Sequence, residues 1–378
     1  MWFWCCVVVF PNLAFLCLFA IARVGHEAQW YRAHYRNILR KEWLNKRIGE
    51  AQRPFQVLGI GYSLPLGGLT LSDVIKSGKT LTRSRAPRSG SGMVIHNRFD
   101  DTSTYEMLAT EDVSLGEDLH PPAESRHPST SVATVVMKLV EALGPVSQTL
   151  LALSQYDRSY WPAVRVLAIP EEAELVQQQV KDALRIARLP ELECDTASAS
   201  DSMMIVDAWL DANERRPLLI VAMKWHDATP PERSSEGCIA VVLAPTFYQL
   251  PNDVHVAGSL HRPVAGEIGT LGDVLENATL WGNVNPASLR HVWITGIDQE
   301  HDRSLLNTLH TRSFSAIATM EKQSRPDRVI GDGAALNPWI SVAAALECCY
   351  EGPQFIVDGA RAAVFHINTD LQYVEPDQ

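Results

Sequence analysis

Two short motifs in the chain would bind phosphate or a dinucleotide if they were complete, and a third motif, for serine chemistry, is absent from the sequence. Ser77-Gly78-Lys79-Thr80 has the ending of a phosphate-binding loop, but Asp73 stands where that loop needs its first glycine. Gly59 and Gly61 begin a dinucleotide-binding pattern, and Leu64 replaces its third glycine. No Gly-x-Ser-x-Gly segment occurs, which argues against a standard α/β-hydrolase. The sequence therefore favours neither nucleotide binding nor standard serine hydrolysis.

The histidines and cysteines are spaced too widely to suggest a metal site. The histidines do not pair on one helical face, and those of interest are His226, His255, His261, His291, His301, His310 and His366. The cysteines outside the apolar N-terminal stretch lack the two-residue spacing of zinc or redox motifs, and they are Cys194, Cys238, Cys348 and Cys349. We therefore expect no metal, no cofactor and free thiols, as in a reducing compartment.

The charged clusters have no catalytic spacing either. They are Arg83, Arg85 and Arg88, the pair Asp100 and Asp101, and the pair Asp298 and Glu300. The arginines fall in a segment rich in Ser, Gly and Pro at 82–92, so we expect an exposed loop. Contact of these arginines with an acidic partner or lipid headgroups is the alternative. The acidic pairs are expected to be solvated loop charges.

Alternating strand and helix signals must position these residues. Strands are predicted at 55–60, 164–169, 218–223, 239–243, 292–297 and 362–367, and helices at 132–156, 171–187, 200–214, 303–310 and 337–349. The helix at 132–156 is expected to be broken near Gly144 and Pro145. The first strand is expected to turn at Gly59, Gly61, Pro65, Gly67 and Gly68, and a polar loop is expected at 114–131. The alternation predicts a mixed α/β fold with parallel strand pairs.

The composition is that of a globular protein with two or three domains, or with one large two-lobed body. The chain has 378 residues, of which 46% are hydrophobic and 20% charged, and we find no repeat of fixed period. Lys and Arg number 33 against 44 Asp and Glu, so the net charge is −11. This balance argues against binding of nucleic acid through its phosphates.

The charge is distributed unevenly along the chain. Residues 1–22 are uncharged and apolar, and they are long enough to span a membrane as a helix. Residues 23–53 hold eight Lys and Arg against three Glu, a net charge of +5, which leaves −16 for the remainder. Because the positive charge follows the apolar stretch, we predict a single-pass inner-membrane protein with its body in the cytoplasm. The alternative is a soluble cytoplasmic protein whose start codon is misplaced.

Four segments between 55 and 368 resemble the thiolase superfamily, in particular its β-ketoacyl synthases. They are Phe55-Gln-Val-Leu-Gly-Ile-Gly-Tyr-Ser-Leu-Pro-Leu-Gly67, Cys194-Asp-Thr-Ala-Ser-Ala-Ser200, the strand pair 218–223 and 236–243, and Gly331-Asp-Gly-Ala-Ala335. The resemblance implies a thiolase-like α/β body with halves at 54–250 and 251–378. These halves would follow a transmembrane anchor at 1–22 and a basic juxtamembrane helix at 23–53.

The same resemblance implies that the catalytic residues are missing. In that family a cysteine at a helix N-terminus attacks a thioester, and two histidines stabilise the oxyanion. Ser198 stands at the cysteine position and Asp332 at one histidine position, so both would be vestigial rather than catalytic. A serine without an adjacent base is a weak nucleophile. An active acyltransferase that uses Ser198 or Cys194 is the alternative.

The whole chain also resembles the type VI secretion lipase adaptor family. The resemblance is carried by the N-terminal leader, by the Gly-Ile-Gly turn at Gly59 and by Ile330-Gly-Asp-Gly-Ala-Ala-Leu-Asn-Pro-Trp339. It implies a non-enzymatic adaptor that binds a phospholipase effector on the cytoplasmic side and helps to load it onto the secretion spike protein. A homodimer is possible, although the cargo could use the same hydrophobic face.

Overall fold

The computed structural model describes residues 2–100, 104–107 and 130–368. The chain divides into two units, Met1–Gln52 and Arg53–Gln378, each considered separately. The first unit contains α1 (Trp2–Trp4), a π-helical turn η1 (Cys5–Val9) and the long helix α2 (Phe10–Ala51). The wide turn precedes Pro11, whose nitrogen has no hydrogen to donate to a carbonyl of the preceding turn. The Asn12 side chain also donates a hydrogen bond, from Nδ2 to Val8 O, at 2.7 Å.

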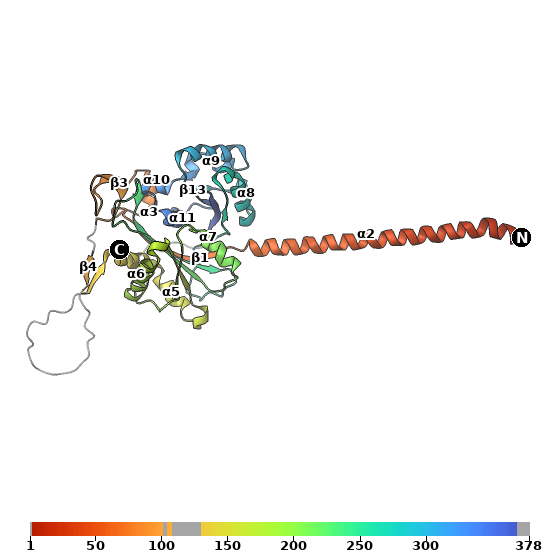
Figure 1. The fold of residues 1–378 in the computed structure, drawn as a ribbon, viewed down its shortest axis with the longest axis horizontal. Coiled ribbons are helices and arrows are strands. Elements are labelled where there is room, and N and C mark those ends of the chain that lie inside the picture. The colour runs from red at the N-terminus through yellow and green to blue at the C-terminus, as the bar shows by residue number, and fades with distance from the viewer. Residues whose placement is uncertain (1, 101–103, 108–129, 369–378) are drawn as a thin grey trace, which may run out of the picture. The chain divides into compact units, whose positions relative to one another are not determined.

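The second unit contains a mixed sheet of eleven strands in the order β14-β13-β15-β16-β11-β1-β10-β8-β6-β7, with β12 paired to β16 (Figure 1). Its strands are β1 (Phe55–Ser63), β6 (Ala163–Ala168), β7 (Cys194–Ser198), β8 (Leu218–Lys224), β10 (Gly237–Pro245), β11 (Gly258–Leu260), β12 (Val264–Ala265), β13 (His291–Thr295), β14 (Gln323–Ser324), β15 (Pro353–Asp358) and β16 (Arg361–Ile367). Two small sheets contain β2 (Arg83–Arg85), β3 (Val94–Asn97) and β9 (Ser234–Ser235), and β4 (Thr104–Met107) and β5 (Thr130–Ala133).

Helices connect these strands. They are α3 (Leu71–Ser77), α4 (Thr134–Leu143), α5 (Ser147–Leu153), α6 (Ala173–Ile186), α7 (Met204–Asp211), α8 (Leu271–Gly282), α9 (Gln299–Thr311), α10 (Pro326–Ile330) and α11 (Asn337–Cys348). Short 3-10 turns are η2 (Gly144–Val146), η3 (Arg158–Tyr160), η4 (Pro170–Glu172), η5 (Ile268–Thr270), η6 (Pro286–Ser288), η7 (Ser315–Ile317), η8 (Met320–Lys322) and η9 (Ala334–Leu336).

The sheet consists of two halves with the same topology. In the first half, β1 pairs antiparallel with β10 and β10 with β8, and then β8, β6 and β7 run parallel. In the second half, β11 pairs antiparallel with β16 and β16 with β15, and then β15, β13 and β14 run parallel. The halves join where β1 pairs with β11, and the chain passes from one to the other between β10 and β11. The segment that leads into α7 therefore corresponds by topology to the segment that leads into α11.

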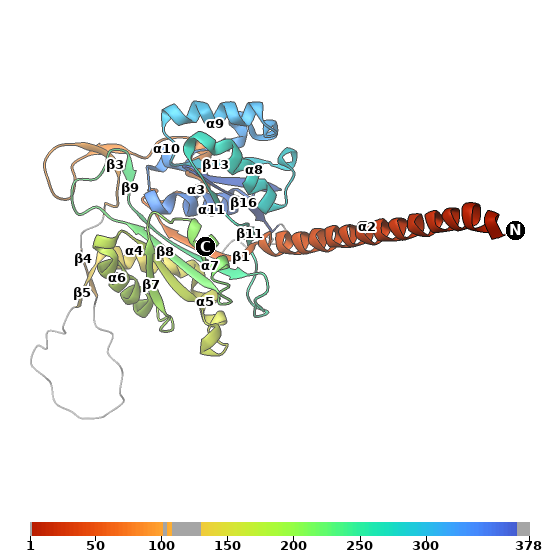
Figure 2. The ribbon, with the colours of Figure 1, turned by 45° about the vertical axis from the view of Figure 1, so that its right-hand side comes forward.

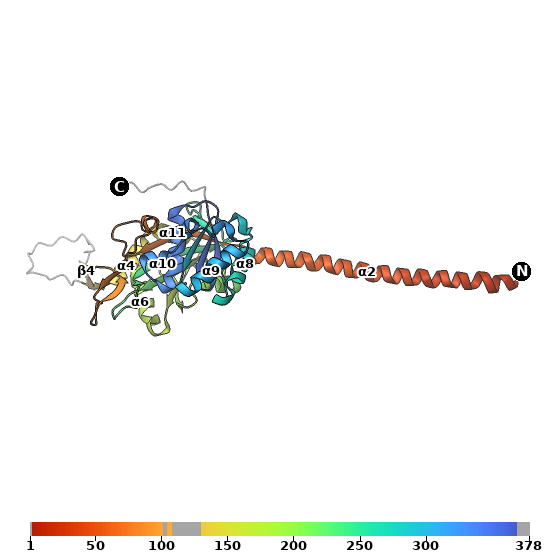
Figure 3. The same ribbon diagram turned by 90° about the horizontal axis from the view of Figure 1, so that it is seen from above.

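Three hydrophobic clusters give this unit its layers. Helices α3, α7 and α11 pack in a central cluster that also receives residues from both halves of the sheet. Helices α4, α5 and α6 cover the other face of the first half, and α8 and α9 cover that of the second (Figure 2). Figure 3 looks onto the layer of α8 and α9. Alternation within β10 shows the arrangement, because Val241 faces the central cluster and Val242 the outer one.

The first strand continues through the first two glycines at which the sequence predicted a turn. β1 runs to Ser63 without reversing, and its register with β10 shifts only at a bulge between Val57 and Gly59. Gly61 is required for close packing, since a Cβ there would lie 2.2 Å from the carbonyl oxygen of Ala142 in α4. The predicted turn is therefore absent at Gly59 and Gly61 and is found at Gly67 and Gly68, whose φ angles are 68° and 85°.

Most other predicted elements are found with shifted ends. The predicted helix at 132–156 is present as α4 and α5, interrupted by the turn at Gly144–Val146. The helix predicted at 200–214 is shorter, because irregular backbone precedes α7. The 82–92 segment contains β2 rather than loop alone, and β15 and α8 were not predicted. Most of the predicted loop at 114–131, and Asp101, lie outside the described residues.

Candidate functional site

A pocket of about 550 Å³ lies at the carboxyl ends of β7, β13 and β15. Ligands of α/β sheets bind in crevices of this kind. Small residues form most of its wall and leave the hollow open: Ala199, Ala265, Gly266, Gly296, Ala334, Ala335, Gly359 and Ala360. Its polar residues are Ser200, Ser202, Asp332, Asn337, Asp358 and Arg361. The pocket thus combines both predicted segments, the one after Cys194 and the one around Asp332.

Ser202, not Ser198, lines this pocket. Ser198 ends the edge strand β7, is exposed, and its Oγ lies 2.7 Å from that of Ser200. Ser202 is 2% exposed, and its hydroxyl has no hydrogen-bond partner among the described residues. Its φ of 45° is in the left-handed region, which is strained for a residue with a Cβ. The serine nearest to the start of α7 is therefore Ser202, a residue that the sequence motif did not indicate.

Asp332 lies in the pocket with both carboxylate oxygens engaged. Its Oδ1 accepts from the Ala334 amide at 2.9 Å and from Asn337 Nδ2 at 2.8 Å, and these bonds fix the turn before α11. Lys224 Nζ lies 3.6 Å from Oδ2. Burial raises the pKa of Asp332, but Lys224 and the two hydrogen bonds outweigh it, so its pKa lies below the usual value. Asp332 is therefore an ionised residue that stabilises the turn before α11, and its negative charge would repel an oxyanion.

A buried carboxylate, that of Asp358, lies in the pocket at the end of β15. Asp358 Oδ1 accepts from Thr295 Oγ1 at 3.0 Å, and Arg361 Nη1 lies 3.7 Å from Oδ2. Burial raises the pKa of Asp358 to about 6 against the opposing effects of Thr295 and Arg361. Nearby, Asp327 Oδ2 accepts from the Gly296 amide at 2.9 Å, and burial raises the Asp327 pKa as well. No sequence motif indicated this concentration of carboxylates.

Cys194, the other candidate nucleophile, is buried in β7. Burial raises the pKa of its thiol to about 11, so the thiol is protonated at neutral pH. A protonated thiol is a weak nucleophile. Cys194 is also absent from the residues that line the pocket. The geometry thus favours neither of the two nucleophiles predicted from the sequence.

The histidines named in the sequence analysis do not line this pocket. No histidine lines it, and the expected position after β13 holds Thr295 and Gly296. His291 is buried at the start of β13, where burial lowers its pKa to about 4. His301 lies beside Asp298, whose side chain caps α9 rather than being only a solvated loop charge. Among the described residues, no group of His, Cys, Asp and Glu is arranged to hold a metal ion.

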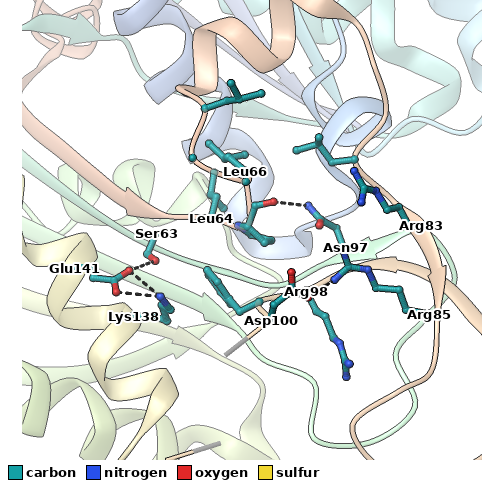
Figure 4. A pocket seen from close by; sticks show the side chains of 16 residues that line it. Ser63, Leu64, Leu66, Arg83, Arg85, Asn97, Arg98, Asp100, Lys138 and Glu141 are labelled. Carbon is teal, nitrogen blue, oxygen red and sulfur yellow. Dashed lines mark hydrogen bonds and ion pairs between the residues drawn. The ribbon is translucent and has the colours of Figure 1, made fainter. Parts of the chain in front are cut away.

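A second pocket, of about 510 Å³, lies beside the turn after β1 (Figure 4). Ser63 Oγ donates to Glu141 Oε2 at 2.7 Å, and Lys138 Nζ lies 3.0 Å from Glu141 Oε1. Arg85 Nη1 is 2.5 Å from Asp100 Oδ1 on the opposite side. Gly78 of the incomplete phosphate motif has a φ of 63° and ends α3 as its C-cap. These residues have structural partners, and none forms a recognisable catalytic arrangement.

Arg88 differs from the other two arginines of the 82–92 segment. Its guanidinium forms a two-pronged ion pair with Glu236, with 2.9 Å between Nη2 and Oε2. The Glu236 side chain is fully buried and also accepts from the amides of His226 and Phe99, each at 3.1 Å. The Arg88 guanidinium stacks 3.9 Å from the Trp225 ring centroid. The expectation of a plain exposed loop is therefore wrong at Arg88.

Comparison with known proteins gives no relative by sequence. No protein-family model matches the chain, and no curated protein matches it. Solved structures match it in fold, among them a Streptomyces albus JA3453 oxazolomycin ketosynthase domain, with 10% identity and a TM-score of 0.54. That match covers 86% of this chain and 98% of that domain.

Two further structures share this architecture. One is a type II polyketide ketosynthase in complex with its acyl-carrier protein, with 10% identity over 84% of this chain and all of that chain, and a TM-score of 0.52. The other is 3-oxoacyl-[acyl-carrier-protein] synthase III from Aquifex aeolicus VF5, with 13% identity over 82% of this chain and 99% of that one, and a TM-score of 0.45. The chain therefore has a thiolase-like, ketosynthase-like α/β fold and an apolar N-terminal helix.

Proposed function

We propose that the chain is a membrane-anchored, non-enzymatic adaptor with a ketosynthase-like body. The residues at the pocket carry this proposal, because Asp332 is an ionised carboxylate whose Oδ1 already accepts hydrogen bonds from the Ala334 amide and the Asn337 side chain. A site that stabilises an oxyanion needs donors, and a carboxylate repels the developing charge. Within the described part of the chain, the Ser202 hydroxyl has no hydrogen-bond partner that could act as a base. These features favour binding over acyl transfer.

The cargo follows from the sequence resemblance to the type VI secretion lipase adaptors. In this proposal the body binds a phospholipase effector on the cytoplasmic side of the inner membrane and helps to load it onto the spike protein. The apolar segment at the N-terminus supports membrane attachment, since Trp2–Ala51 contains a window with a mean hydropathy of 2.5. Thr134–Leu153 has a similar composition, but half of it is buried, as in the core of a soluble body.

The first test separates the adaptor from an enzyme. We expect Ser198→Ala, Ser202→Ala and Asp332→Asn, each in the full chain, to leave effector export at the wild-type level. Asparagine at 332 keeps the oxygen that accepts from Ala334, so the turn before α11 is preserved. Loss of export in a variant that folds and accumulates normally would contradict the proposal.

A covalent probe tests the rival acyltransferase directly. An acyl-thioester analogue should label neither Ser202 nor Ser198 nor Cys194 in the intact protein, as judged by peptide mass spectrometry. Labelling that disappears in one matching variant would identify a nucleophile. That result would favour the acyltransferase, in keeping with the carrier-bound ketosynthase among the structural neighbours.

The partner needs its own measurement. The detergent-solubilised full chain, isolated from source cells, should copurify with a lipase or a secretion spike protein. The control is the same isolation from cells in which the candidate effector gene is deleted. Enrichment of acyl carriers, with neither a lipase nor a spike protein, would overturn the adaptor.

A further inference from the structure

The pocket beside the turn after β1 is basic, although the body around it is acidic (Figure 4). Four cationic side chains line it against two carboxylates: Arg83, Arg85, Arg98 and Lys138 against Asp100 and Glu141. Residues 54–378 hold 25 Lys and Arg against 41 Asp and Glu, a net charge of −16. An excess of positive charge in one hollow of an acidic body attracts an anionic partner. We call this hollow the basic pocket.

Two of its four cations have no counter-ion. The two carboxylates of the pocket pair with Arg85 and Lys138. Arg83 and Arg98 form no ion pair or hydrogen bond with any residue that the structure describes, and the Nε atom of Arg98 is buried without an acceptor there. A buried N–H group without an acceptor is costly, and a carboxylate is among the strongest acceptors for a guanidinium group. The basic pocket therefore offers two arginines to a ligand.

Two of the arginines lie on a strand with a free edge. Arg83 and Arg85 alternate along β2 and both line the basic pocket, whereas Ser84 between them does not. β2 is the outer strand of the sheet β2-β3-β9, and within the described ranges no strand pairs with its other edge. On the opposite face, Ser84 pairs with Ile95, which is 37% exposed. A strand added at this edge would meet arginines on one face and a small apolar surface on the other.

The structure holds the basic pocket open. Asn97 at the end of β3 donates from Nδ2 to Pro65 O at 3.3 Å, a bond drawn in Figure 4, and to Ile330 O at 3.1 Å. These bonds connect the small sheet to the turn after β1 and to α10. Lys138 Nζ lies 5.0 Å from the centroid of the Phe99 ring. A preformed pocket loses little entropy when it binds.

We propose that an extended acidic segment of a partner protein binds along β2 with its carboxylates in the basic pocket. Alternate acidic side chains of the added strand face Arg83 and Arg85 as cross-strand neighbours, and a further carboxylate reaches Arg98. A small anion such as phosphate could pair with the guanidinium groups, but it would leave the backbone edge of β2 unused. The inference rests on the proposed adaptor role and specifies the docking surface and the kind of cargo segment that it takes.

The first test uses the detergent-solubilised full chain and a fluorescent heptapeptide of alternating Glu and Val, with Glu at both ends. Fluorescence anisotropy should show binding of this peptide and none of the Lys and Val counterpart. Arg83→Glu/Arg98→Gln should weaken binding about tenfold or more, because two charged hydrogen-bonding partners are lost. Arg83 is exposed, so Arg83→Glu alone tests the pocket even if the double variant does not fold.

A matched variant and two further probes separate the pocket from charge in general. Arg188→Glu/Arg303→Gln makes the same change in net charge at exposed arginines outside the pocket and should leave binding unchanged. A peptide with N-methylated valines keeps its charge but cannot pair fully with β2, so it should bind about tenfold more weakly or worse. The inference is overturned if the acidic peptide does not bind, if Arg83→Glu binds it as the wild type does, or if N-methylation has no effect. Displacement of the peptide by inorganic phosphate, but not by sodium chloride of equal ionic strength, would assign the pocket to a small anion instead.

Copurification from source cells then distinguishes this inference from the adaptor role. The wild type and the Arg188→Glu/Arg303→Gln control should retain the lipase or the spike protein, and Arg83→Glu/Arg98→Gln should lose it. Undiminished copurification with a variant that no longer binds the acidic peptide would overturn the docking surface and leave the adaptor role standing. Capture of neither protein by the wild type would overturn the adaptor role, and this assignment of its docking surface with it.

Discussion

Asp358 lies at the end of β15 with only 7% of its surface exposed. Its carboxylate is costly to ionise there, because burial disfavours the charged form and the Thr295 hydroxyl and Arg361 compensate only in part. Asp327 and Asp332 add further negative charge. Asp332 is different, since Lys224 and two hydrogen bonds stabilise its charge. The pKa values of these two carboxyl groups, which line one pocket, are therefore shifted in opposite directions.

We expect Asp358 to make the folded state more stable as the pH falls from 7 to 4. Its folded pKa of about 6 exceeds the unfolded value, so the folded state binds the proton more tightly in this range. Asp358→Asn keeps an oxygen for Thr295 and removes the charge. The difference in unfolding free energy, variant minus wild type, should therefore increase by about 2–3 kcal/mol from pH 4 to pH 7. Urea unfolding of both proteins at pH 4 and pH 7 measures this difference. The same difference at the two pH values would contradict the prediction.

Arg88 and Arg85 form a matched pair for testing burial of an ion pair. Arg88→Ala leaves the fully buried Glu236 carboxylate unpaired, so we expect a loss of about 3–5 kcal/mol in unfolding free energy. Arg85→Ala removes a pair whose Asp100 is 80% exposed, and a loss of at most about 1 kcal/mol is expected. Equal losses in urea unfolding would show that burial of Glu236 is not what sets the cost.

The sequence indicated some of these residues and not others. Asp332 was found because neighbouring residues resemble a local motif. Ser202 was not, because its position depends on a positive φ and on burial, which a run of Ser, Ala and Asp does not specify. Asp358 lines the pocket from the end of β15, far along the chain from Ser202. Arg88 looked like a loop charge because its partner, Glu236, is distant in the sequence.

The elements depend on close contacts that local signals do not reveal. β1 and β10 were recognisable as apolar runs, whereas β15 begins at a proline and contains the buried polar residue Gln354. The glycines of β1 suggested a turn, since isolated glycines usually interrupt strands. In the structure they allow a helix to approach the sheet, which is a tertiary requirement.

Gly61 and Gly59 test this explanation within one strand. A Cβ at Gly61 would lie 2.2 Å from Ala142 O, a backbone atom that cannot move alone, so Gly61→Ala should cost about 3 kcal/mol or more. A Cβ at Gly59 would meet side chains alone, Val146 at 3.3 Å and Thr149 Oγ1 at 4.0 Å, and Gly59→Ala should cost less than about 1 kcal/mol. Thermal and urea unfolding of both variants decide it. Similar costs at the two positions would show that the approach of α4 does not require Gly61.

At the scale of the whole molecule, the fold class follows from alternating strands and helices, and the structure confirms it. The residue pattern alone does not show the duplicated topology, because the two halves have the same strand order but no sequence repeat of fixed period. Only the family resemblance implied two halves. The pocket depends on this duplication, since α7 and α11 occupy corresponding places and bring Ser202 and Asp332 to one hollow. A motif search along one chain segment cannot find a site that two halves build together.

The N-terminal unit determines whether the whole chain is attached to a membrane. Residues 2–51 are helical throughout, and their apolar part is suited to either a membrane anchor or a signal sequence. We expect the full chain to stay with membranes after alkaline carbonate extraction. Leu13→Arg/Leu16→Arg should release it, because each arginine costs about 2.5–3.5 kcal/mol within a membrane-spanning helix. Leu13→Ile/Leu16→Ile is the matched control and should remain in the membrane fraction.

The intact mass of the membrane-bound protein distinguishes an anchor from a signal sequence. An anchor remains part of the mature chain, so the mass should match all 378 residues, whereas cleavage would remove the apolar stretch. The positive charge of residues 23–53 also predicts sidedness, since it retains this segment in the cytoplasm. Protease added to inverted inner-membrane vesicles should therefore digest the body, and protease added to spheroplasts should not. Digestion in spheroplasts alone would place the body outside the cytoplasm and would contradict an adaptor that loads its cargo there.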